Sequence, residues 1–134
     1  MRTSLFALVL MASAIMPNFL SGQESTDKIS VELDTVVNDS IEYELIVTEL
    51  GYESYLVTQP PMNFYTESYY KNWNHRYAIE WNIRYRTGPN QYLYENEIWY
   101  DFTTNYGIEL EYKLYYFFRY FEKKYNVKLV PRGK

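Results

Sequence analysis

Three acidic residues and a tryptophan alternate along one short stretch of the chain, and together they suggest a ligand site. If residues 95–101 were extended, their alternate side chains would share one face. A tryptophan ring can stack on a sugar while carboxylates accept its hydroxyl protons, and paired carboxylates about 5 to 9.5 Å apart can hydrolyse glycosidic bonds. Alternatively, the acids form a wet strand face and the tryptophan packs against a helix. The candidate ligand-binding residues are Glu95, Glu97, Trp99 and Asp101.

The other residues able to do chemistry lack suitable neighbours. His75 is the only histidine, and the chain has no cysteine. The residues one helical turn from His75 are Lys71 and Ile79, and neither is a carboxylate that could orient it or share a metal. The stretch DFTTNYG, residues 101–107, resembles a calcium loop, but Tyr112 stands where the closing acid is needed. We therefore interpret these features as a surface histidine and a turn before a helix, and the sequence predicts no catalytic residue, cofactor or metal site.

Residues 69–86, YYKNWNHRYAIEWNIRYR, mix aromatic and basic side chains as nucleic-acid-binding surfaces do. The formal net charge of the chain is −4, which opposes binding to a polyanion. Arg76, Glu80 and Arg84 are spaced to form an ion-pair ladder on a solvent face. The large rings instead recur at helical spacing, so we expect a buried stripe and no nucleic-acid partner. The stripe consists of Tyr70, Trp73, Tyr77, Trp81 and Tyr85.

The N-terminus has the layout of a secretory signal. Arg2 precedes an apolar run from Leu5 to Met16, and the small residues Ser21 and Gly22 follow. The run has 12 residues, whereas a helix needs about 20 to cross a bilayer. We expect residues 1–22 to be removed and the protein to be exported to the periplasm or cell envelope, the alternative being an uncleaved anchor.

The remaining chain has the length of one domain, with an uneven charge distribution. Residues 23–67 hold one cation and ten acids, a net charge of −9, whereas residues 68–134 carry +4. An acidic N-terminal segment is therefore expected to lie against a mildly basic body. We expect a flexible acidic tether at 23–40, a single globular domain at 41–130 and a tail at 131–134. Within the tether, alternating apolar residues leave a marginal strand as the alternative.

Two helices are predicted in the globular domain. Thr66 can cap the first helix, and Gly88 can end it in a left-handed conformation. The second helix is expected at 105–124, where Glu109 and Glu111 in the first turns suit the helix dipole. Its apolar residues are spaced three and four apart. The expected inward residues are Leu110, Leu114, Phe117, Phe118, Phe121 and Tyr125.

Three short stretches are predicted as strands. Apolar and polar residues alternate along 41–49, and residues 97–101 and 127–130 are possible partners for that strand. The predicted fold is therefore α+β, with two long, aromatic-rich amphipathic helices running antiparallel and packed on a small antiparallel sheet.

Several stretches carry a family resemblance. They are YELIVTELGYESYLVTQPPMNFYTESYYKNWN, EWNIRYR, YDFTTNYGIELEYKLYYFFRYFEKK and VKLV, which together span most of residues 41–130. In these stretches the chain resembles a family of small exported or lipoprotein-like proteins of Bacteroidota, domain of unknown function 6146. The resemblance implies an exported, compact protein and assigns no activity. We expect a non-enzymatic structural or protein-interaction domain of the cell envelope, the alternative being a small carbohydrate-binding module. A partner envelope protein or glycan would then contact it, and a membrane only through an uncleaved leader or that partner.

Overall fold

The computed structural model describes residues 29–37 and 40–133, so the expected secretory segment lies outside the described residues. Most of the regular structure in these residues is helical, and a pair of strands precedes the helices in the chain, which confirms the α+β class. The elements in chain order are β1 (Ile29–Val37), β2 (Ser40–Val47), α2 (Tyr52–Leu56), the 3₁₀ helix η1 (Met62–Phe64), α3 (Glu67–Thr87), the 3₁₀ helix η2 (Gln91–Leu93) and α4 (Ile108–Lys124).

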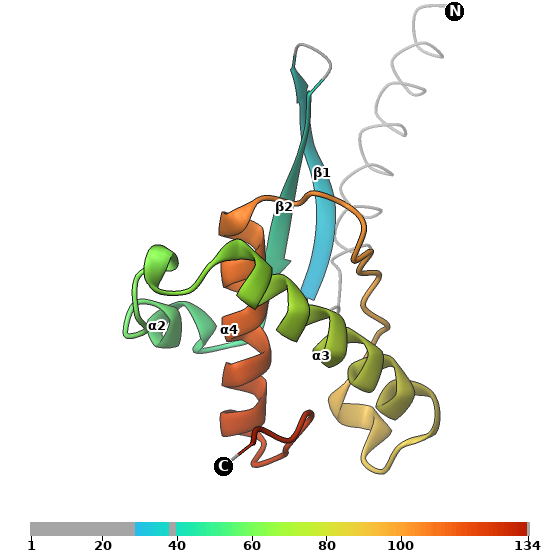
Figure 1. Ribbon diagram of the computed structural model, residues 1–134. Coiled ribbons are helices and arrows are strands. Elements are labelled where there is room, and N and C mark those ends of the chain that lie inside the picture. The colour runs from blue at the N-terminus through green and yellow to red at the C-terminus, as the bar shows by residue number, and fades with distance from the viewer. Residues whose placement is uncertain (1–28, 38–39, 134) are drawn as a thin grey trace, which may run out of the picture.

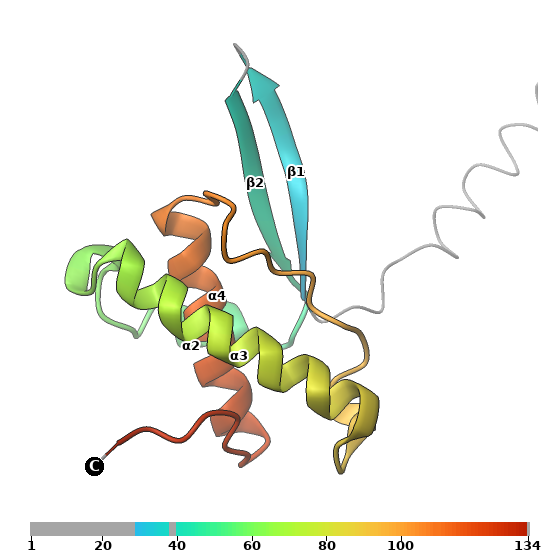
Figure 2. The same cartoon turned by 45° about the vertical axis from the view of Figure 1, so that its right-hand side comes forward.

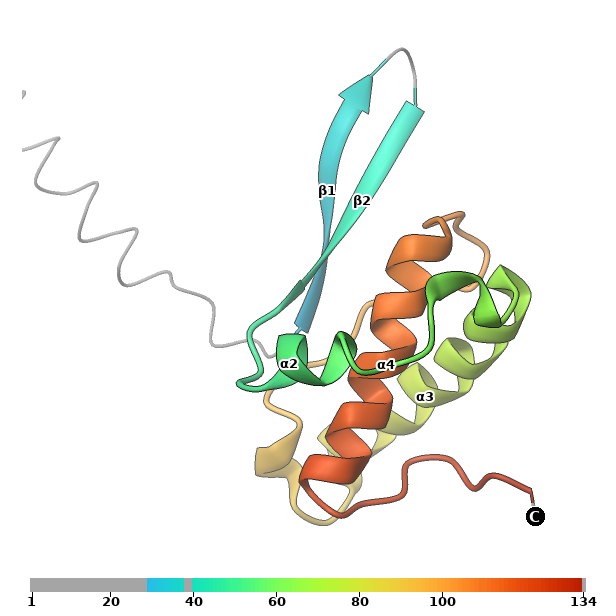
Figure 3. The same ribbon diagram turned by 90° about the vertical axis from the view of Figure 1, so that its left-hand side faces the viewer.

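β1 and β2 pair antiparallel as a hairpin that extends away from the helices (Figures 1 and 3). At its base Ile29 pairs with Val47. Ile29 is buried, and Leu45 and Val47 pack against the core. Because an isolated two-stranded ribbon is marginally stable in water, the hairpin depends on this contact with the helices.

The predicted sheet paired the strand at 41–49 with the wrong segments. Residues 41–47 do lie in β2, but β2 pairs with β1, which comes from the predicted flexible tether at 23–40. The alternative of a strand there is therefore the one found. Residues 97–101 and 127–130 contain no strand. A neighbouring segment pairs at a smaller loop-closure cost than a distant one, and residues 97–101 instead bond to side chains of α3.

α3 begins where the sequence predicts and ends for a different reason. The hydroxyl of Thr66 accepts a hydrogen bond from the backbone N–H of Tyr69 at 3.1 Å, which confirms the N-cap. The predicted left-handed Gly88 is wrong, because its φ is −79°. A Cβ at this position would lie 2.6 Å from Cα of Arg84, so Gly88 is required by close backbone approach.

The aromatic stripe on α3 is buried at its centre and open at its edge. Tyr70, Tyr77 and Trp81 have no exposed surface, whereas Trp73 and Tyr85 are half-buried. The prediction of a core stripe is thus confirmed for three of its rings. Trp73 lies instead at the boundary between core and solvent, where guanidinium groups cover it.

α3 crosses α4, as Figures 1 and 2 show, and the two helices run in the same general direction. Residue numbers rise together along the contact, so the predicted antiparallel arrangement is wrong. The chain between the helices returns to the starting end before α4 begins. Contacts along the crossing are Tyr70 with Tyr112, Tyr77 with Phe118 and Trp81 with Phe121, with ring centroids 5.6, 4.9 and 4.6 Å apart.

α4 is buried on several sides, because α2, η1 and β2 also pack against it. Tyrosine rings fill much of this core, and their hydroxyls bond to backbone carbonyl groups at its edge. Tyr52 donates to the carbonyl of Lys113 at 2.7 Å, and Tyr112 donates to that of Pro60 at 2.8 Å. The buried rings therefore keep their polar atoms satisfied. Of the predicted inward residues, Leu110, Leu114, Phe117, Phe118 and Phe121 are buried, whereas Tyr125 is only half-buried.

The tail beyond α4 folds back along α3 (Figure 3). Leu129 and Val130 are buried, and the carbonyl of Lys128 accepts a hydrogen bond from Arg84 at 2.7 Å. Within residues 29–37 and 40–133, no helix combines the length and the apolar character needed to span a membrane.

Candidate functional site

The predicted face at residues 95–101 does not form, because this stretch is not a strand. Glu95 has a φ of 48°, a left-handed conformation incompatible with an extended chain. Glu97 forms an ion pair with Arg86 at the end of α3. The stretch therefore does not present its acids and tryptophan in alternation, although Trp99 is 82% exposed.

Trp99 belongs to a set of exposed apolar side chains on one side of α3. Phe102 follows in the same loop, and the two isoleucines lie one helical turn apart on α3. We call Ile79, Ile83, Trp99 and Phe102 the outer apolar surface; their exposed fractions are 49%, 48%, 82% and 39%. Isolated exposed apolar residues are ordinary, but a group of four on adjacent segments is the kind of feature found at binding surfaces.

Specific contacts hold the loop of Trp99 against α3. The side chain of Asn82 accepts from the N–H of Ile98 at 2.8 Å and donates to its carbonyl at 3.0 Å. One end of the segment is thus fixed, and Ile98 itself is buried. At the other end, the ring of Phe102 lies 4.6 Å from that of His75. The exposed indole of Trp99 is therefore carried by an anchored backbone.

The acid next to this surface is already used within the loop. Oδ1 of Asp101 accepts hydrogen bonds from the N–H and hydroxyl of Thr103, and Oδ2 accepts one from the hydroxyl of Thr104. These bonds hold the pKa of Asp101 below its ordinary value. The loop is a turn, as the sequence indicated. Among the described residues no three histidine, aspartate or glutamate side chains come together to hold a metal ion.

A buried carboxylate is the polar feature that the sequence analysis missed. Glu111, expected to serve the helix dipole, has no exposed surface. Its Oε2 accepts from the amide of Asn74 at 2.8 Å, and the hydroxyl of Tyr100 lies 3.0 Å from both carboxylate oxygens. Burial raises the pKa of Glu111 above its ordinary value, although these bonds lower it. Glu111 precedes the inward residues Leu114 and Phe118 by three and seven positions, and this helical spacing could have indicated that Glu111 is buried.

A second missed feature is the position of Arg132. Its guanidinium lies 4.1 Å from the ring centre of Trp73 and donates to the hydroxyls of Tyr77 and Tyr115 at 3.1 and 2.7 Å. The predicted ion-pair ladder is only partly formed: Arg84 pairs with Glu80 at 2.8 Å, while Arg76 lies over Trp73. No local pattern reveals where the tail returns to α3.

A cleft of about 580 Å³ opens between β2 and the start of α4. Tyr43 and Tyr106 meet edge to face in its wall, with ring centroids 4.9 Å apart. Its size suits a small molecule. Glu109 and Lys113 line it and pair with each other at 2.8 Å. The residues that line the cleft therefore do not identify a ligand or a reaction.

The comparisons with known proteins concern the whole chain. No curated protein matches it, and no solved structure matches it. A family model does match, and it covers residues 4–132, which include the helices, the loop of Trp99 and the tail up to Arg132. Since that match spans nearly the entire sequence, the chain belongs to the family of unknown function DUF6146.

Proposed function

We propose that this protein is an exported, non-enzymatic interaction domain of the cell envelope that binds a partner protein through the outer apolar surface. The observation that carries the proposal is the exposure of Trp99, 82%, on an anchored loop beside exposed Ile79 and Ile83. Tryptophan is strongly enriched among the residues that dominate binding energy at protein interfaces.

The surroundings of this surface favour a protein over a sugar. An interface commonly has an apolar centre and a polar rim. Here the centre contains aliphatic side chains, which offer no hydrogen bonds to sugar hydroxyls. Two ion pairs, Arg86 with Glu97 and Arg84 with Glu80, belong to the same helix and its adjoining loop. A partner with its own apolar patch would cover the centre while these charges remain in water.

Substitution within the surface tests the proposal. Trp99→Ser removes the most exposed ring, and Phe64→Ser, at a residue 60% exposed near the opposite end of α3, is the matched control. We expect a photo-crosslinking or affinity experiment in the native envelope to recover the same partner with wild type and with Phe64→Ser, and to lose it with Trp99→Ser. Equal recovery with all three proteins would contradict the proposal.

Export is the second part of the proposal. It rests on Arg2, the apolar run Leu5–Met16 and the small residues before Gln23. Mass spectrometry of the native protein should find a chain that begins near Gln23 in the envelope or periplasmic fraction. A full-length chain recovered from the cytosol would contradict export and the envelope partner together.

A carbohydrate-binding module is the alternative function, and the exposure of Trp99 also favours it. In this case the exposed indole would stack on the apolar face of a sugar, while Glu97 stays paired with Arg86 and Asp101 with Thr103 and Thr104. Isothermal titration against envelope glycans separates the two functions. Binding of a glycan that is lost in Trp99→Ala would support the module, whereas heat exchange only with a protein partner would support the interaction domain.

A further inference from the structure

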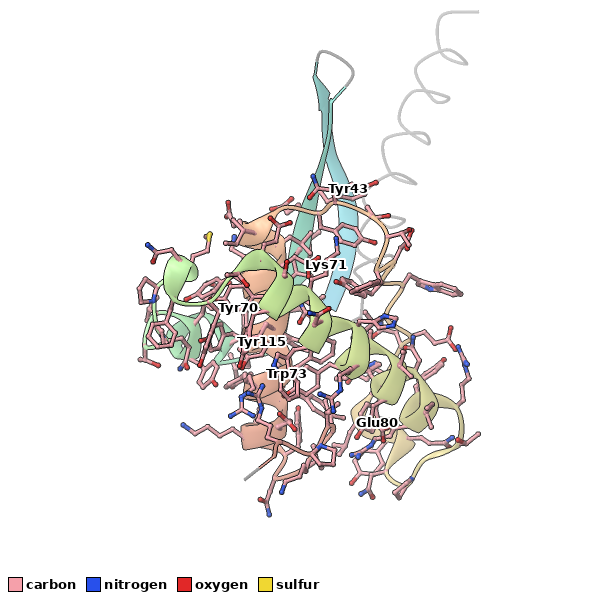
Figure 4. All side chains as sticks on the ribbon, in the orientation of Figure 1. Tyr43, Tyr70, Lys71, Trp73, Glu80 and Tyr115 are labelled. Carbon is pink, nitrogen blue, oxygen red and sulfur yellow. The ribbon has the colours of Figure 1, made fainter. Side chains whose placement is uncertain are left out.

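Arginine and tyrosine side chains from α3, α4 and the tail meet around Trp73. Figure 4 shows Trp73 and Tyr115 close together where α3 crosses α4. We call this set the arginine–tyrosine cluster; it contains Tyr69, Trp73, Arg76, Tyr77, Tyr115, Arg119 and Arg132.

The cluster has more positive charge than its own acid neutralises. Among the described residues, Glu122 is the carboxylate that pairs with it, through Arg119 at 3.3 Å. Arg76 and Arg132 instead lie against the ring of Trp73, at 4.6 and 4.1 Å from its centre, and neither pairs with a carboxylate within residues 29–37 and 40–133. Three guanidinium groups and one carboxylate leave a local charge of about +2.

The hydrogen bonds of the cluster also leave donors in excess. Arg132 donates to Tyr77 and Tyr115, but its Nε is buried without an acceptor. Such an orphaned buried donor often marks the place of a water or ion. Burial raises the pKa of Tyr69, yet hydrogen bonds from Tyr115 and Arg132 outweigh it, so this pKa lies below its ordinary value. Burial raises the pKa values of Tyr77 and Tyr115, so the case for an anion rests on the unpaired guanidinium groups and the orphaned Nε rather than on the tyrosines.

We propose that the arginine–tyrosine cluster binds a phosphate-type dianion. The charge of such a group matches the local excess, and arginine forks fit phosphate oxygens in a way that lysine does not. Arg76 is exposed, so the anion would enter beside it, while the half-buried Arg132, whose Nε lacks an acceptor, holds it from within. Arg76 lies one helical turn before Ile79, so the cluster adjoins the outer apolar surface on α3. Phosphate binding and recovery of the protein partner are separate measurements, so either proposal can fail without the other.

Titration of the full chain with inorganic phosphate at constant ionic strength tests the site. Arg76→Gln removes an exposed guanidinium that makes no ion pair, so the fold should be kept. We expect its affinity for phosphate to fall about tenfold, as for the loss of a charged hydrogen bond. Arg86→Gln, an exposed arginine elsewhere on α3, is the control and should bind as wild type does. Absence of phosphate binding by wild type, or equal affinity in Arg76→Gln, would overturn the proposal.

A second measurement identifies the source of the phosphate group. Vesicles containing phosphatidic acid are compared with vesicles of phosphatidylcholine alone, for wild type and Arg76→Gln. Binding to phosphatidic acid that depends on Arg76 would assign the site to a lipid headgroup. Binding of free phosphate without vesicle binding would assign it to a soluble phosphate compound. Vesicle binding unchanged in Arg76→Gln, together with no response to free phosphate, would reject the cluster as an anion site.

Discussion

Replacement of the buried carboxylate by an amide, Glu111→Gln, is expected to increase stability. The folded protein surrounds Glu111 with donors, the amide of Asn74 at 2.8 Å and the hydroxyl of Tyr100 at 3.0 Å. It also leaves Oδ1 of Asn74 buried without a partner. The substituted amide keeps an oxygen for Tyr100 and adds an NH₂ group that can donate to that orphaned oxygen.

The size of the effect follows from the opposing contributions at this site. Hydrogen bonds to a charged acceptor contribute about 1.5 to 3 kcal/mol each, while desolvation of a carboxylate costs several kcal/mol. The raised pKa of Glu111 shows that desolvation is the larger effect. We therefore expect Glu111→Gln to raise the free energy of unfolding by about 1 kcal/mol at neutral pH. Glu111→Ala removes the side-chain acceptor of both donors, although the amide of Asn74 keeps its bond to the main-chain carbonyl at position 111, and should lower this free energy by about 3 kcal/mol.

Urea unfolding followed by tryptophan fluorescence measures the difference at several pH values. The pKa of Glu111 is higher in the folded than in the unfolded protein, so its protonation adds stability as pH falls, and that gain is lost as pH rises through the folded pKa. The advantage of Glu111→Gln over wild type should thus be largest at neutral pH and disappear below the ordinary glutamate pKa of about 4.3. A variant less stable than wild type by about 1 kcal/mol or more at neutral pH would refute this reasoning.

Three further substitutions test the fold. Trp81→Ala removes an indole with no exposed surface that donates to the carbonyl of Asn96 at 2.8 Å, and should cost about 3 to 5 kcal/mol by urea unfolding. Gly51→Ala should cost about 1 to 3 kcal/mol in the same assay, since Gly51 has a φ of 89° and an added Cβ would lie 2.4 Å from the hydroxyl of Tyr120. His75→Gln removes a ring that packs on Phe102 but should change stability by no more than about 0.5 kcal/mol, and loss of a purified activity with an intact melting temperature would show that His75 has a chemical role.

The sequence alone determined the two long helices and the residues that each of them buries. Both depend on local physics: Thr66 supplies the first amides of α3 with an acceptor, and the spacing of Tyr77 and Trp81 places them on one face. The burial of Phe117 and Phe121 on α4 follows from the same spacing rule. The strand at 41–47 was likewise visible from alternation.

The tertiary structure alone decided which segments meet. β1 and not 127–130 pairs with β2, because a strand that follows directly in the chain closes the shortest loop. The direction of α4 relative to α3, the return of Arg132 to Trp73 and the exposure of Trp99 depend on contacts between distant residues. Such contacts depend on the packing energy of the whole core, which the spacing of residues within one segment does not determine.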